Sequence, residues 1–308
     1  MSIDTPIRQD RKIKSRTVVD STNSIQSNSV GDLNLLFWNV KHKDLSSIVE
    51  SIANHHKADF ILLAELSQKH IQKYKDALGK RGYVFRATPS SKVKIFDRLT
   101  NIQGSLEQVS SYYSQDDRLT SIIYNLNGES VLIVGVHLFS IASMKFSESR
   151  KGFAQLALKV IEEIEKQHKI DKTIIIGDFN LNPHESGMID YFGFNATLCK
   201  NTAQLEHREI AGEKRRYFFN PSWQAYSNVG IKDAPAGTFY YSETYDTTLL
   251  YWNLLDQAII RPKLVPNSRG FKIITDGGER VPTLLNSELK PDVEKYSDHL
   301  PILYSIKI

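Results

Sequence analysis

The chain has 308 residues, enough for one large domain or two small ones with a sizeable core. Hydrophobic residues make up 41% and charged residues 24%, a composition that excludes a wholly disordered or fibrous chain. The formal net charge of +4 is compatible with a polyanionic partner, while the single cysteine, Cys199, excludes an internal disulfide framework and a cysteine-rich zinc site.

Residues 1–31 form a predicted polar tail, and residues 32–308 form one predicted folded domain. Five basic residues and one acid lie between Arg8 and Arg16, and no apolar block follows them, so no secretory signal is expected. We expect a solvated tail, with an arm that contacts nucleic acid or a protein partner as the alternative. No run of about 18 apolar residues occurs, so we expect no membrane span and a cytoplasmic protein.

The first part of the domain alternates strands and helices. The apolar runs LNLLFWN and DFILLAE predict two buried strands, ending at Asn39 and Glu65. Between them, Asp44 is the predicted N-cap of a helix that buries Leu45, Ile48, Val49, Ile52 and Ala53. A second amphipathic helix is predicted over residues 69–80, with Ile71, Tyr74 and Leu78 facing inward.

The rest of the domain mixes hairpins, one long helix and further strands. Residues 88–117 are predicted to form a loop region, and LTSIIYN and SVLIVGVHL form strands around an Asn127-Gly128 turn. A helix is predicted from Ser149 to His168, with Phe153, Leu156, Val160, Ile161 and Ile164 buried. TIIIGDFN, LLDQAII and PILYSIKI predict three more strands, and residues 200–243 are expected to form surface loops with short hairpins. This order predicts an α/β domain of packed sheets with helices outside.

Polar side chains terminate or begin most of these strands. A single aspartate, asparagine or histidine at a strand end is most often a turn, cap or structural residue. The strand ends here carry a whole set of such residues: Asn39, Glu65, His137, Asp178, Asn180, Asp256, Asp298 and His299. Because strand ends on one side of layered sheets can converge, we expect these side chains to line one site.

The ordered motifs resemble the endonuclease/exonuclease/phosphatase superfamily, whose fold is DNase I-like. The motifs are WN, DFILLAE, GVHL, GDFN, LLDQAII and SDHLPIL, and the resemblance spans residues 33–308. GDFN and SDHLP are specific as a pair, whereas WN and LLAE mean little alone. Three further stretches, FFNPSW, GTFYY and YWNLLDQAIIRP, resemble an uncharacterised bacterial group within the superfamily.

The resemblance implies a four-layer α/β sandwich of two mostly antiparallel sheets flanked by helices. It also implies cleavage of phosphate esters with a divalent cation, usually Mg²⁺, with Mn²⁺ as a substitute. Magnesium prefers oxygen ligands, and the implied ligands are Asn39, Glu65 and Asp298. The superfamily commonly has glutamine before the metal-binding glutamate, where this chain has Ala64.

The resemblance further implies roles in the reaction. Asp178 would orient or deprotonate the attacking water, and Asn180 would hold a phosphate oxygen. His299, oriented by Asp256, would form a carboxylate–imidazole pair, and His137 would donate a hydrogen bond or proton to the phosphate. Arg118 is a candidate phosphate contact. Which histidine acts as base and which as acid stays open at this point.

The leading functional prediction is a Mg²⁺-dependent phosphodiester hydrolase, a nuclease that cuts DNA or RNA by in-line water attack. A phosphomonoesterase, or a lipid or inositol phosphate phosphodiesterase with the same site, is the alternative. A non-catalytic nucleic-acid-binding protein on this fold is a third hypothesis. Basic and aromatic residues between His207 and Tyr226 predict either a nucleic-acid contact or a basic turn followed by a core strand.

Overall fold

The computed structural model describes most of the predicted domain. It covers residues 32–86, 92–98, 106–107, 118–126, 128–140, 147–228, 231, 234–241, 251–278 and 281–307. The predicted tail and Asn127 of the predicted turn lie outside these residues. No helix in the described part of the chain is long and apolar enough to cross a membrane.

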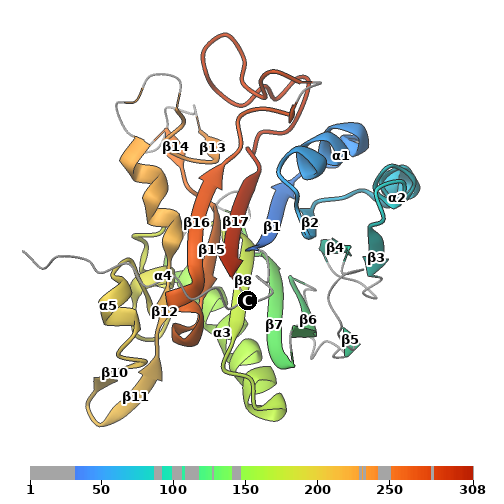
Figure 1. Cartoon of the computed structure of the whole chain (residues 1–308). Helices are drawn as coiled ribbons and strands as arrows, with labels where there is room; N and C mark the ends of the chain where they lie inside the picture. Colours follow the sequence, from blue (N-terminus) through green and yellow to red (C-terminus); the bar gives the residue numbers. More distant parts are fainter. Residues whose placement is uncertain are drawn as a thin grey trace, which may run out of the picture. The chain divides into compact units, whose positions relative to one another are not determined.

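One sheet has six strands in the order β16-β17-β1-β2-β4-β3 (Figure 1). Its strands are β1 (Asp32–Asn39), β2 (Phe60–Ala64), β3 (Val84–Arg86), β4 (Val93–Asp97), β16 (Ser268–Ile273) and β17 (Ile302–Lys307). Only β1 and β2 are parallel neighbours, and every other pair in this sheet is antiparallel.

The second sheet has seven strands in the order β5-β6-β7-β8-β15-β12-β9. Its strands are β5 (Leu106–Glu107), β6 (Leu119–Leu126), β7 (Glu129–His137), β8 (Thr173–Asp178), β9 (Ala196–Thr197), β12 (Phe218–Phe219) and β15 (Asp256–Ile260). The predicted hairpin is confirmed, since β6 and β7 are antiparallel and Leu126 pairs with Glu129. β7 and β8 run parallel, as do β9 and β12.

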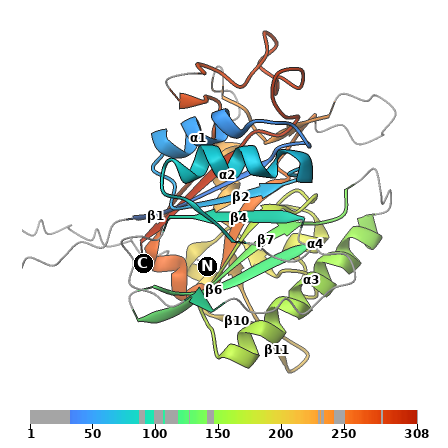
Figure 2. The same cartoon turned by 90° about the vertical axis from the view of Figure 1, so that its right-hand side faces the viewer.

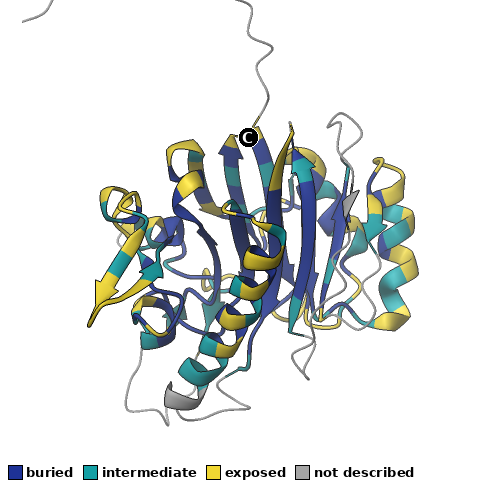
Figure 3. Cartoon of the chain, turned by 90° about the horizontal axis from the view of Figure 1, so that it is seen from below, coloured by how far each residue is buried: buried dark blue, intermediate teal, exposed yellow. Residues whose placement is uncertain are grey.

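The two sheets face each other, and helices cover their outer faces, so the predicted four-layer sandwich is confirmed (Figure 2). Helices α1 (Ser46–His55) and α2 (Ile71–Gly79) cover the six-stranded sheet. Helix α3 (Ser147–His168) and the short α4 (Ser186–Ile189) cover the seven-stranded sheet. Strands β2 and β8 are buried along their whole length because both faces of each sheet are covered. Figure 3 shows the buried strands of the sheets beside helices whose outer sides are exposed.

Short elements complete the domain. They are the turns of 3₁₀ helix η1 (Gln68–His70), η2 (Pro221–Asn228) and η3 (Pro262–Asn267), helix α5 (Lys200–Ala203), and two ribbons. The ribbons pair β10 (His207–Ile210) with β11 (Glu213–Arg216), and β13 (Phe239–Tyr240) with β14 (Trp252–Asn253).

Two details of the helices differ from the prediction. Helix α1 begins at Ser46 with Leu45 as N-cap, so the predicted cap at Asp44 is wrong. The Asp44 carboxylate instead accepts from the Ser46 hydroxyl at 2.8 Å and pairs with Lys73 of α2 at 2.7 Å, which ties the two helices together. In α3, Leu156 is 57% exposed and Phe153 and Val160 are only partly buried, although all three were predicted to be buried. The stripe that faces the sheet is instead Ala154, Ala157, Leu158, Ile161 and Ile164.

Two stretches expected to be loops contribute to the sheets. Residues 88–117 contain β4, whose Val93, Ile95 and Phe96 are buried, as well as β5. Within residues 200–243, the exposed β10–β11 ribbon matches the expected short hairpin. Phe218 and Phe219 of β12 are buried in the core, which agrees with the alternative of a basic turn followed by a core strand. Strands of two to five residues carry too little periodicity to be recognised in a polar context.

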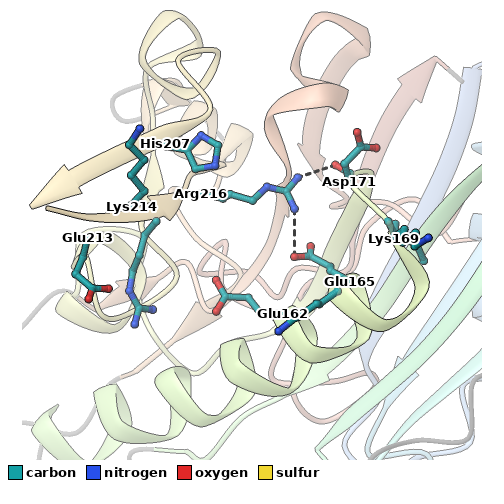
Figure 4. Close-up of a pocket in the computed structure, with 11 residues that line it drawn as sticks. Glu162, Glu165, Lys169, Asp171, His207, Glu213, Lys214 and Arg216 are labelled. Carbon is teal, nitrogen blue, oxygen red and sulfur yellow. Dashed lines mark hydrogen bonds and ion pairs between the residues drawn. The ribbon is translucent and has the colours of Figure 1, made fainter.

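The end of the sheets away from Asp178 carries a charged cavity of about 580 Å³ between α3 and the β10–β11 ribbon (Figure 4). Arg216 donates to the Asp171 carbonyl at 3.1 Å and contacts Glu165 of α3 at 3.5 Å. Glu165 also accepts two bonds of 2.8 Å from the fully buried guanidinium of Arg261, which follows β15. We interpret this end as part of the scaffold, because one carboxylate holds α3, β11 and β15 together.

Candidate active site

The strand register brings the predicted polar residues to one edge of the two sheets. In the six-stranded sheet, Asn39 lies opposite Ala64, so Glu65 follows directly beside it. In the seven-stranded sheet, Asp178 lies between His137 on one side and Asp256 on the other. His299 lies just before β17, separated from its first residue, Ile302, by Leu300 and Pro301, and Ile302 pairs with Phe37 of β1 next to this edge.

Asp178 lies at the centre of the cluster and is almost completely buried. Its carboxylate accepts from the Asn39 amide at 3.2 Å and from the backbone N–H of Asn180 at 2.9 Å. Nε2 atoms of His137 and His299 lie 3.8 Å and 3.9 Å from Asp178 Oδ2. Burial raises the pKa of Asp178 above the usual carboxyl range, although the charge of His299 opposes this effect.

His299 and Asp256 form the expected carboxylate–imidazole pair, with 2.8 Å between Nδ1 and Oδ2. The Trp38 indole donates to the His299 carbonyl at 2.8 Å and fixes the backbone there. Burial disfavours the charged imidazolium, but the carboxylates of Asp256 and Asp178 outweigh burial and raise the pKa of His299. Nδ1 is therefore held toward Asp256, and Nε2 is directed toward Asp178.

His137 lies on the opposite side of Asp178 and has a different protonation state. Its Nε2 is 3.4 Å from Glu65 Oε1, and its buried Nδ1 has no hydrogen-bond partner among the described residues. Burial lowers the pKa of His137 to about 3, and the positive charges of Arg118 and His299 add to this effect. His137 is neutral at pH 7, whereas His299 is charged, so the two histidines can take different roles.

The remaining predicted residues lie around this cluster. The Asn180 amide donates to the Leu138 carbonyl at 3.0 Å. Arg118 donates to the carbonyls of His137 and Leu138 at 3.2 and 3.3 Å, and its guanidinium lies 3.6 Å from the ring centroid of Phe139. Asp298 pairs with the Lys41 ammonium at 2.5 Å, and no hydrogen bond in the described part of the chain joins its side chain to Asn39 or Glu65.

Backbone strain accompanies the cluster. The φ angles of Lys41, His42, Glu65 and Asn180 are 46°, 58°, 52° and 51°, in the left-handed region that non-glycine residues rarely adopt. A hydrogen bond of 2.9 Å from the His42 N–H to the Glu65 carbonyl ties two of these turns together. Such conformations persist where surrounding structure over-determines them, and they concentrate at functional sites.

The donor chemistry at this edge fits a hard divalent cation. Glu65 is 27% exposed and offers carboxylate oxygens beside the Asn39 carboxamide, and oxygen ligands of this kind suit Mg²⁺. Asp178, Asp256 and His299 form a second group whose ligand atoms lie within 4.8 Å of one another. The members of that second group are almost completely buried, and two of its ligand atoms form the tight Asp256–His299 hydrogen bond. The more exposed Glu65, beside Asn39, is therefore the better metal ligand.

Several contacting residues were missed from the sequence. Thr238 accepts a hydrogen bond of 3.2 Å from the Asp256 N–H, and the Phe239 ring packs against His299 with centroids 4.9 Å apart. The Ser297 hydroxyl donates to the Asn39 carbonyl at 2.6 Å. Thr238 and Phe239 belong to the motif GTFYY, and Ser297 belongs to SDHLPIL. The motifs therefore indicated that these residues matter, but not which site residues they contact.

No protein-family model matches the sequence, and no curated protein matches it. In structure, the chain is similar to TDP2 from D. rerio in complex with a single-stranded DNA product, at 17% identity and a TM-score of 0.56, over 90% of this chain and 99% of that one. An endonuclease/exonuclease/phosphatase family protein from Bacteroides thetaiotaomicron has 14% identity and a TM-score of 0.56, over 90% and 98% of the two chains.

A mannosyl-6-phosphatase from the same bacterium has 14% identity and a TM-score of 0.54, over 88% of this chain and 98% of that one. The chain therefore has the DNase I-like fold, the fold of the endonuclease/exonuclease/phosphatase proteins. Identities of this size show a shared fold, so the activity has to be argued from the side chains.

Proposed function

We propose that this chain is a divalent-metal-dependent phosphodiesterase that cuts nucleic acid. The observation that carries the proposal is the contact of Asp178 with Asn39, together with its position between a neutral His137 and a charged His299. A carboxylate, an amide and two histidines in different protonation states supply the groups that phosphodiester hydrolysis needs.

Glu65 and Asn39 would hold the cation. Asp298 would be a third ligand if its carboxylate left the ion pair with Lys41 and bound the metal instead. Mg²⁺ is the metal proposed, with Mn²⁺ as a substitute, because all three side chains offer oxygen atoms. When bound, the cation would neutralise charge on the phosphoryl oxygens and leaving oxygen.

Asp178 would accept the proton of the attacking water. Its raised pKa brings the carboxylate closer to neutral pH, where a general base is most effective. The backbone N–H of Asn180 and the amide of Asn39 hold its two oxygens and so fix its direction. The Asn180 side chain would contact a phosphate oxygen.

The charged His299 would donate from Nε2 to a phosphoryl oxygen, because Asp256 keeps its Nδ1–H occupied. The neutral His137 would donate a second hydrogen bond, and Arg118 would add positive charge at the rim. In this proposal neither histidine is the base, and both donate hydrogen bonds to the phosphate.

Nucleic acid is favoured as the substrate by two observations. The chain carries a net charge of +4, and one protein of similar structure, TDP2 from D. rerio, was solved with single-stranded DNA. The test is cleavage of plasmid DNA, single-stranded DNA and RNA with Mg²⁺, Mn²⁺ or chelator, by the wild type and by Asp178→Asn. We expect metal-dependent cleavage that the variant loses. Equal cleavage by both proteins would remove Asp178 from the mechanism.

A phosphomonoesterase is the second candidate, and it is supported by the similarity to a mannosyl-6-phosphatase. The same protein would be assayed on sugar phosphates, inositol phosphates and sphingomyelin at equal metal concentration. Turnover of a monoester with intact nucleic acid would select this candidate.

A further inference from the structure

The β13–β14 ribbon is attached directly to the catalytic cluster. Thr238 accepts a hydrogen bond from the Asp256 N–H through its hydroxyl and another of 2.8 Å from the Leu300 N–H through its carbonyl. Phe239 forms a β-bridge with His299. A ligand bound to this ribbon would therefore be held in a fixed position relative to the reacting groups.

The two strands of the ribbon are closely joined. A side chain at Gly237 would place its Cβ 2.5 Å from the Asn253 carbonyl oxygen, so only glycine permits this approach. The Thr238 N–H donates to the same carbonyl at 2.9 Å, and the Tyr241 N–H donates to the Tyr251 carbonyl at 2.7 Å.

The ribbon presents aromatic rings away from His299. Side chains alternate along a strand, so Phe239 faces His299 while Tyr240 faces the other way. Tyr240 stacks on Tyr251 with centroids 6.0 Å apart and 22° between planes, and meets Trp252 edge-on at 5.3 Å. These rings line a cavity of about 530 Å³, here called the ribbon pocket, with Ile231, Ala234, Pro235, Glu288, Leu289 and Lys290.

The pocket is aromatic and close to electrically neutral. The Lys290 ammonium lies 4.4 Å from the Tyr240 ring centroid, and it also pairs with Glu288 at 2.7 Å. Because the only two charged side chains among the lining residues are opposite and paired, the pocket suits a flat, uncharged ring better than a phosphate. Tyr251 is 42% exposed, so part of this aromatic lining is open to solvent.

We propose that the ribbon pocket binds a nucleobase of the strand that is being cut. The inference rests on the proposed function and narrows its substrate to a strand with unpaired bases. The pocket and His299 contact opposite faces of the ribbon, so the base belongs to a nucleotide flanking the scissile phosphate. A base must leave its stack to enter such a pocket, and this favours single-stranded over duplex substrate.

The experiment measures binding without cleavage. Fluorescence anisotropy in chelator would compare a labelled single-stranded oligonucleotide with an abasic oligonucleotide of equal length and charge. The proteins would be the wild type, Tyr240→Ala, Tyr240→Phe and Phe192→Ala, the last altering an exposed aromatic away from the ribbon. Thermal unfolding would establish that each variant is folded.

The binding free energy of stacking between one base and an aromatic ring corresponds to a loss of about tenfold in oligonucleotide affinity for Tyr240→Ala. Tyr240→Phe should bind the oligonucleotide as tightly as the wild type because the aromatic ring remains. The abasic strand should bind the wild type and Tyr240→Ala with equal affinity. Equal loss for the abasic strand, or no loss with Tyr240→Ala, would overturn the inference, as would undetectable binding by the wild type.

A parallel assay separates this inference from the proposed function. Hydrolysis of methyl p-nitrophenyl phosphate, which carries no base, by the wild type with Mg²⁺ tests the catalytic site alone. If the wild type hydrolyses this ester but oligonucleotide binding does not depend on the Tyr240 ring, the proposed function stands and base binding in the ribbon pocket is rejected. If binding depends on the Tyr240 ring but no phosphodiester is hydrolysed, the base site stands and the proposed phosphodiesterase activity is rejected.

Discussion

Asp256 does not face the reacting phosphate in the proposed mechanism, and it acts through His299. Its Oδ2 holds His299 Nδ1 at 2.8 Å, while its buried Oδ1 has no partner among the described residues. The aspartate both orients the imidazole and stabilises its positive charge. Its removal should therefore change a chemical property of His299 that can be measured without substrate.

The substitution Asp256→Asn is expected to lower the pKa of His299 because the strongest stabiliser of the imidazolium is lost. We expect kcat to fall by a factor of about 10² or more, with a much smaller change in KM. NMR titration of the His299 ring in both proteins checks the pKa. An unchanged titration would mean that Asp256 does not set the charge of His299.

The pH dependence of activity should report Asp178. A general base must be ionised, and burial raises the pKa of this carboxyl, so kcat/KM should decline on the acid side at a higher pH than the usual carboxyl value of about 4 would give. His137 has a pKa of about 3 and should add no step near pH 6.5. Full activity maintained down to about pH 4 would exclude a raised pKa for the base.

At the scale of elements, the strands that end in polar residues were predictable. The runs that end at Asn39, Glu65, His137 and Asp178 are continuous and apolar because both of their faces are covered, and this leaves a clear sequence signal. Register then follows from parallel pairing, which aligns His137 with Asp178. The convergence of these polar side chains at one edge was therefore predictable from the sequence.

The parts that were not predictable depend on contacts between distant residues. Lys41 meets Asp298 across 257 positions, and the β13–β14 ribbon meets His299 through two-residue strands. Strands of that length have no measurable period, and a pairing between two charged side chains leaves no local pattern. The same limit explains why β4 and β5 were expected to be loops.

Gly177 fixes the distance between β7 and β8. A Cβ there would lie 2.1 Å from the Val136 carbonyl oxygen, so Gly177→Ala would push β8 away and displace Asp178 from His137. We expect the free energy of unfolding to fall by about 2 kcal/mol, and activity to fall with it. Chemical denaturation is the measurement.

Gly79→Ala is the matched control, because a Cβ at the end of α2 meets nothing within 4 Å. It should leave the free energy of unfolding unchanged or raise it by up to about 1 kcal/mol. If both substitutions changed the free energy of unfolding equally, the close approach of β7 and β8 at Gly177 would not contribute to stability.

The link between α3 and β15 is predicted to serve stability rather than catalysis. Glu165→Gln would take from the buried Arg261 guanidinium its nearest carboxylate and leave Glu162 at 3.7 Å, which should lower the free energy of unfolding by about 3 kcal/mol. Because the pair lies at the end of the sheets away from Asp178, kcat of the folded fraction should stay near the wild-type value. A loss of kcat without a loss of stability would contradict this division.

At the scale of the whole molecule, the candidate site belongs to both sheets. Asn39 belongs to the six-stranded sheet, and Glu65 and His299 lie in segments next to its strands β2 and β17. His137, Asp178 and Asp256 belong to the seven-stranded sheet. The hydrogen bond from Asn39 to Asp178 crosses between them. The cluster can therefore form only when the two sheets pack, so the sandwich itself positions the reacting groups.

The central claim is that Glu65 holds a metal and Asp178 activates water at one phosphodiesterase site. The most direct test is the Mg²⁺ concentration dependence of cleavage of a single-stranded oligonucleotide by the wild type, Glu65→Gln and Asp178→Asn. We predict no cleavage in chelator, at least about tenfold more Mg²⁺ for half-maximal rate with Glu65→Gln, and a fall of about 10² or more in kcat with Asp178→Asn. Cleavage in chelator, or wild-type Mg²⁺ curves for both variants, would contradict the claim.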